Sequence, residues 1–299
     1  MNRCLNERLV PMSLLEIPAY SSVADSVREA ALKLRTSGTS VTISAPLDEY
    51  GIFSSALIEA AFLDAGIPYQ RRLRNEPTPG RGTSVVIHGD RVSALPQIES
   101  NPLKFSIHPV EVDALIASGG DVRKGLLSPV AISAALSASI SPSGNKTRNL
   151  LPWALVGNWL SEGLEYTYDP VYTVLRDYLC ERGIIRVVAL PEVIDVEPRT
   201  IPGIDSVALD AVRRRWSKFD LEGRAQSLSH LLKPLLHSDT LSTARLEELG
   251  WHRILAPGWE SDMASQIERF LVSWKSTDTS KRQLAGDAID NLLRTGRLD

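Results

Sequence analysis

Residues 41–55, VTISAPLDEYGIFSS, decide the fold of this chain. The β-branched run Val41–Ser44 predicts a buried strand, and the acidic, glycine-containing turn after it leads into an apolar stretch with helical spacing. In α/β proteins, ligands bind beyond the carboxyl ends of the strands. The stretch therefore predicts an α/β fold and makes Asp48 a candidate metal ligand.

The alternation of strand and helix patterns continues from residue 23 to about residue 193. Strands are also predicted for 68–74, 84–90, 105–112 and 184–193, and helices for 23–34, 54–66, 126–140, 150–164 and 169–183. Crossover helices between strands favour a mostly parallel, doubly wound sheet. We expect an α/β domain over 23–200, preceded by an N-terminal extension (1–22). A smaller, mainly helical C-terminal domain (201–299) follows.

Composition excludes several classes of protein. The 299 residues carry a net charge of −3, so the chain lacks the overall positive charge that would indicate a nucleic-acid-binding protein. Cys4 and Cys180 are too few for a disulfide framework or a zinc site. The sequence has no apolar run of the roughly 18–20 residues that span a bilayer. These features predict a soluble, cytoplasmic protein without a membrane contact.

Potential metal-ligating residues follow three of the predicted strands: Asp48 after the first, His88 and Asp90 after the next, and His108 further on. The carboxyl ends of parallel strands meet at one edge of a sheet, so we expect these residues to lie close together. Each also has an ordinary structural explanation. Asp48 suits a helix N-cap, the histidines suit hydrogen-bonded structural positions, and Asp90 suits a turn.

This arrangement resembles the DHH phosphoesterase superfamily, particularly its RecJ-like branch, over about residues 40–205. The family's first motif is His-x-Asp-x-Asp-Gly. Aligned on Gly51, the resemblance places Pro46, Asp48 and Tyr50 at its ligand positions. The later motifs fall on Asp90 or His88, on Ser106, Ile107 and His108, and on Ser161 or Glu162 in ALVGNWLSEG (154–163).

This sequence departs from the family pattern in two ways that affect the chemistry expected of its site. Pro46 has no side-chain ligand atom and Tyr50 is no carboxylate, whereas a two-metal site needs several ligands around ions about 3.5–4 Å apart. The C-terminal part also lacks the GGGH-type glycine cluster of active RecJ-like nucleases. The resemblance therefore implies a degenerate site with no catalytic residues, metal or cofactor.

Within the superfamily, such a chain is similar to the eukaryotic cell-division-cycle-forty-five family and its archaeal RecJ-like counterparts. That resemblance implies a non-catalytic DNA replication factor that binds the GINS complex, supports the MCM helicase in a CMG-type assembly and contacts single-stranded DNA. Arg213, Arg214, Arg215 and Trp216 form a candidate nucleic-acid contact. A solvated helix face with one buried tryptophan is the other explanation for that run.

Two further functions stay open. The first is an active, manganese-dependent phosphoesterase or single-strand exonuclease with a rearranged ligand set of Asp48, Glu49, His88, Asp90 and His108. The second is a small-molecule-binding α/β domain with a regulatory helical tail. In that protein the ligand would occupy the cleft near Asp48–Gly51.

Overall fold

The computed structural model describes residues 13–89, 95–116, 122–237, 241–276 and 280–298. It confirms the predicted α/β class, with a five-stranded sheet in the order β2-β1-β3-β5-β4. Strands β1 (Val41–Pro46), β2 (Tyr69–Arg74), β3 (Ser84–Ile87) and β5 (Leu103–Ile107) run parallel, and β4 (Gln97–Ser100) is the antiparallel edge strand.

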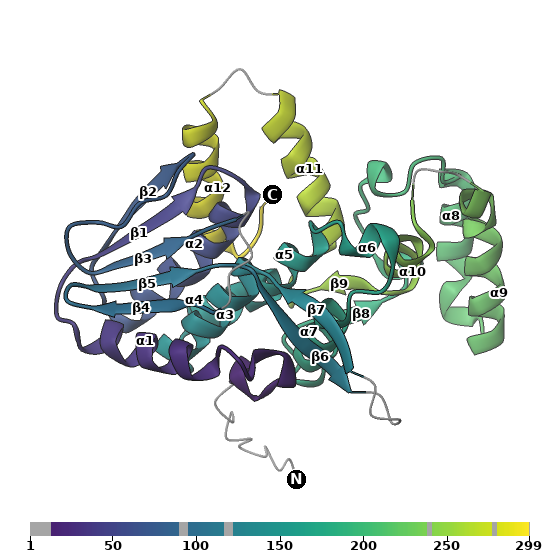
Figure 1. The fold of residues 1–299 in the computed structure, drawn as a ribbon. Helices are drawn as coiled ribbons and strands as arrows, with labels where there is room; N and C mark the ends of the chain where they lie inside the picture. Colours follow the sequence, from purple (N-terminus) through teal and green to yellow (C-terminus); the bar gives the residue numbers. More distant parts are fainter. Residues whose placement is uncertain (1–12, 90–94, 117–121, 238–240, 277–279, 299) are drawn as a thin grey trace, which may run out of the picture.

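The helices α1 (Ala24–Thr36), α2 (Glu49–Ala65) and α3 (Pro129–Ile140) form a layer against this sheet (Figure 1). Helix α3 packs between the other two, and α2 is buried almost all round from Gly51 to Phe62. The alternation along β1 explains the layer, because Val41, Ile43 and Ala45 share one face of the strand and are fully buried. On the other face, segment 75–83 covers Thr42 and Ser44, since the amide of Thr78 donates to Ser44 Oγ.

A two-stranded antiparallel ribbon of β6 (Val110–Ile116) and β7 (Val122–Leu127) follows β5 and packs against α7 (Pro170–Glu181). The predicted strand over 105–112 is therefore wrong: β5 ends at Ile107, and β6 begins beyond Pro109 in a different sheet. The predicted helix over 126–140 begins only at Pro129, because β7 occupies the residues before it.

Two other predicted elements also differ from the structure. The helix expected over 150–164 is divided into a 3-10 segment (Leu151–Leu155) that holds Pro152 near its start and two four-residue helices, α5 (Val156–Trp159) and α6 (Gly163–Tyr166). The strand expected over 184–193 is three residues long, β8 (Arg186–Val188), and a 3-10 turn follows it.

The C-terminal part is mainly helical, as predicted. Helices α8 (Ser206–Arg215) and α9 (Leu221–Leu232) project from the body in Figure 1. After α10 (Thr243–Trp251), the short strand β9 (Arg253–Leu255) pairs with β8, and α11 (Met263–Ser276) follows. The last helix, α12 (Lys281–Thr295), returns to pack against α2, and its Asp290 accepts a hydrogen bond from Arg71 of β2. These contacts cross the domain boundary expected near residue 200, and the division into two domains stays a prediction.

Candidate functional site at the carboxyl edge of the sheet

The register of the parallel strands brings the predicted site residues to one edge of the sheet. Ser44 pairs with Val86 and Ile87 with Ile107, so the segments after β1, β3 and β5 emerge side by side. A Cβ atom at Gly89 would lie 3.0 Å from Asp48 Oδ2, which places the Asp48 carboxylate against the segment that follows β3. Asp90 lies outside the described residues.

Asp48 is the N-cap of α2. Its backbone is extended and its Oδ1 accepts a hydrogen bond of 2.8 Å from the amide of Gly51. Gly51 itself is required by close packing, because a Cβ atom there would overlap the backbone carbonyl of Pro46. The most specific part of the family motif is thus explained by how this strand-to-helix turn packs.

The side chains of His88 and His108 stack face to face, with ring centroids 4.1 Å apart and planes 3° from parallel. Imidazole lone pairs lie in the ring plane, and a metal ion binds them at roughly 2 Å. Lone pairs in two parallel, stacked planes cannot converge on one ion. Burial also lowers the pKa of His108, which favours its neutral form, and its Nδ1 has no hydrogen-bond partner among the described residues.

A small hollow of about 40 Å³ lies where the expected motif positions meet. Its lining residues include Tyr50, Gly89, Pro109, Ser128, Gly157, Asn158 and Ser161. Burial raises the pKa of Tyr50, and the nearby carboxylates of Asp48, Glu49 and Glu162 raise it further, so this phenol stays protonated. The Ser161 hydroxyl donates to the backbone carbonyl of Asn158.

Asn158 and Asp169 were not identified from the sequence as site residues. The amide nitrogen of Asn158 donates to the Leu126 carbonyl at 2.7 Å and to Asp169 Oδ2 at 2.9 Å. Its Oδ1 is buried and has no partner among the described residues, so it can accept one hydrogen bond from a donor such as water. Asp169 caps α7 through the amides of Val171 and Tyr172, and burial raises its pKa despite these hydrogen bonds.

The described residues do not fit the two-metal centre that the family uses. Asp48 lies against Gly89, and His88 stacks on His108. Pro46 and Ile107, however, have no ligand atom, and Ser106, Ser161 and Tyr50 carry hydroxyl groups in place of carboxylates or imidazoles. Across the described ranges, no three side chains of histidine, cysteine, aspartate or glutamate form a group that could hold a metal ion. This edge offers a capped helix and a small hollow whose exposed lining is mostly apolar.

The basic run at the end of α8 does not expose its aromatic ring. Trp216 is 6% exposed, its Nε1 donates to Glu192 Oε1, and the Arg224 guanidinium lies over the indole at 5.3 Å. This placement agrees with the buried-tryptophan explanation and leaves no open face for a stacked base. Arg213 contacts Asp210 and the Val193 carbonyl, whereas Arg214 and Arg215 are exposed.

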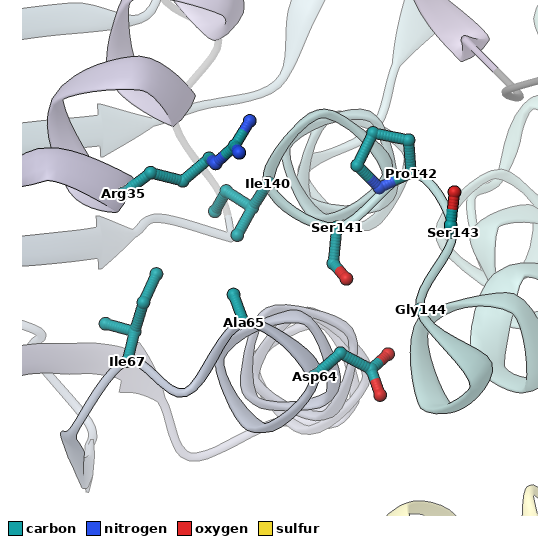
Figure 2. A pocket seen from close by; sticks show the side chains of 9 residues that line it. All are labelled: Arg35, Asp64, Ala65, Ile67, Ile140, Ser141, Pro142, Ser143 and Gly144. Carbon is teal, nitrogen blue, oxygen red and sulfur yellow. The ribbon is translucent and has the colours of Figure 1, made fainter.

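A larger hollow, of about 510 Å³, lies at the opposite edge of the sheet, between the ends of α1, α2 and α3 (Figure 2). Asp64 points towards Gly144 there, and its carboxylate accepts from the amide and the hydroxyl of Thr147 at 2.8 and 2.9 Å. That carboxylate therefore holds the start of α4 (Asn145–Leu150). This hollow is not the cleft expected near Asp48–Gly51.

No model of a known protein family matches the chain, and no curated protein matches it. Within the part of the chain that the structure describes, no helix is both long and apolar enough to cross a lipid bilayer.

Proposed function

We propose that the chain is a non-catalytic DNA replication factor, a DHH-like scaffold of the RecJ-like branch that binds GINS and supports the MCM helicase in an archaeal cytoplasm. One observation carries the proposal. The described positions that the resemblance assigns to metal ligands gather at one edge of the sheet, yet the side chains described there form no group that could hold a metal ion. A retained arrangement with lost ligands is expected of a pseudoenzyme.

Packing explains why such a scaffold would persist without metal ions. The strand-to-helix turn is held by the Asp48 cap and by the contact between Gly51 and Pro46, neither of which involves a metal. Behind it, the fully buried side chains of Ile43, Phe53 and Phe105 belong to one continuous core. A stable fold that does no chemistry is suited to presenting surfaces to partners.

The partners come from the resemblance, and the molecule offers surfaces compatible with them. Helices α8 and α9 project from the body, where the side chains of Leu221 and Val207 are 86% and 74% exposed. Exposed apolar side chains on a projecting element favour a protein contact. Arg214 and Arg215, exposed on the same element, are compatible with a phosphate backbone.

Manganese binding is the first test of this proposal. We would titrate the metal-stripped full chain by calorimetry and assay single-stranded DNA cleavage on the same sample. We expect no stoichiometric binding and no cleavage. Stoichiometric binding that the Asp48→Asn variant loses, together with cleavage, would contradict the proposal and favour the active phosphoesterase with a variant ligand set.

Partner binding is the second test. Purified GINS and MCM from the same source would be mixed with the chain and analysed by size-exclusion chromatography. We expect co-elution with GINS and a higher unwinding rate of MCM in the ternary mixture. If the chain elutes alone and leaves unwinding unchanged, the replication role is wrong, whatever the metal titration gives.

A further inference from the structure

A hollow of about 160 Å³ lies where the C-terminal segment meets the α/β layer. Two arginines line it: Arg148 from α4 and Arg297 just after α12. Asn149 and Thr295 add polar groups, and the other lining residues include Ile184, Pro257 and Trp259. Among the described residues that line it, none is an aspartate or a glutamate. The hollow is therefore positively charged.

The fold brings together the two segments that carry these arginines. Helix α12 ends at Gly296, whose φ of +77° is the left-handed conformation that glycine adopts readily. The backbone of Gly296 lies against Asn149, since a Cβ atom there would be 3.6 Å from the Asn149 carbonyl oxygen. The Trp153 indole donates to the Gly296 carbonyl at 2.9 Å. These contacts join the segments that carry Arg148 and Arg297.

Neither arginine side chain donates a hydrogen bond to the described carbonyls at the end of α12. Two carbonyls at the end of α12 have other donors, because the Gly296 amide donates to the Leu292 carbonyl and Lys146 Nζ donates to the Leu293 carbonyl. Arg297 donates one N–H to the Gly258 carbonyl, which orients its guanidinium, and its remaining side-chain donors have no partner among the residues that the structure describes. In the described part of the chain, neither arginine has a carboxylate partner.

We propose that this hollow binds the phosphate or carboxylate group of a small molecule. A guanidinium presents parallel N–H donors that match the oxygens of these groups, and an anion between two arginines relieves the repulsion between them. The volume is below the roughly 300–1,000 Å³ of sites for drug-sized ligands, which fits a small oxyanion or the charged end of a metabolite. The bound group would link α4 to the C-terminal segment.

Thermal unfolding of the full chain tests this site with inorganic phosphate as the probe. Sodium chloride of matched ionic strength is the reference, and sodium acetate is a parallel arm. We expect phosphate to raise Tm with saturation. In Arg148→Gln or Arg297→Gln, the phosphate concentration needed for half the effect should rise by at least about tenfold, because a charge-assisted pair is lost.

Arg294→Gln is the matched control, since this arginine is exposed at the same helix end but does not line the hollow. It should keep the full response, and Arg148→Lys should keep part of it. A response to phosphate alone supports a phosphate ester as the natural ligand, and an equal response to acetate supports a carboxylate. No response to either anion, or one that survives in the double glutamine variant, would overturn the proposal.

Discussion

The carboxyl edge of the sheet and the contacts of the C-terminal segment both contain acidic side chains that are buried or half-buried, and the two regions use them differently. Near the sheet edge, the carboxylates of Asp48 and Asp169 accept hydrogen bonds from backbone amides and cap the N-termini of helices α2 and α7. Where the C-terminal segment is held, carboxylates pair with arginines. Arg71 of β2 donates two hydrogen bonds of 2.6 Å to Glu59 of α2 and one of 2.7 Å to Asp290 of α12, and Asp262 pairs with Arg253. In both regions, these described carboxylates hold segments of the chain together.

The largest effect that this comparison predicts is at Arg253, which is 1% exposed. Its guanidinium bonds to Asp262 Oδ1, to the Leu249 carbonyl and to Thr200 Oγ1. Arg253→Met would leave the buried Asp262 without its counter-ion, so we expect a loss of about 3–5 kcal/mol in the free energy of unfolding. Urea titration measures it. Arg282→Met on the exposed side of α12 is the control and should change little.

The second prediction compares a buried and an exposed carboxylate that pair with the same arginine. Arg71 binds both Glu59, which is fully buried, and Asp290, whose side chain is 69% exposed. We expect Glu59→Gln to lower the free energy of unfolding by roughly 1.5–3 kcal/mol. Asp290→Asn should cost only about 0–1 kcal/mol, because water screens an exposed pair. Chemical unfolding of both variants gives the comparison, and equal losses would show that burial does not set the strength of this contact.

The smallest effect concerns Asp48. Asp48→Ala removes the cap of α2 and should lower the free energy of unfolding by about 1 kcal/mol. Asp48→Asn should change it by only a few tenths of a kcal/mol, because asparagine caps a helix equally well. The measurement is thermal unfolding with and without manganese. A manganese-dependent rise in Tm for the parent that Asp48→Asn lacks would mean that this carboxylate binds metal as well as capping the helix.

The sequence was most informative where local signals agree. The β-branched run before Asp48 predicted β1, and Gly66 predicted the end of α2. Strand propensity and a left-handed helix end depend only on nearby residues, so the sequence shows them directly. The strand over 105–112 was misjudged because apolar residues flank Pro109 on both sides, and the pattern does not show that the two halves join different sheets. The pairing of β8 with β9 joins three-residue strands far apart in the chain, which no local pattern reveals.

The site could be predicted in position but not in detail. Parallel strands bring their carboxyl ends together, so the proximity of the segments after β1, β3 and β5 followed from topology alone. The stacking of His88 on His108 depends on rotamers. The buried amide of Asn158 takes its partners from Leu126 and Asp169, which belong to separate elements. Such contacts arise only once the whole chain has folded.

The place of α12 has a consequence for how the protein is made. Helix α2 ends at residue 65, and the helix that packs against it begins at residue 281. A ribosome adding about 5–20 residues per second needs tens of seconds to produce the intervening chain. For that time the nascent protein carries an apolar helix without its final cover, so a chain that stalls before residue 281 would be a substrate for chaperones and proteases.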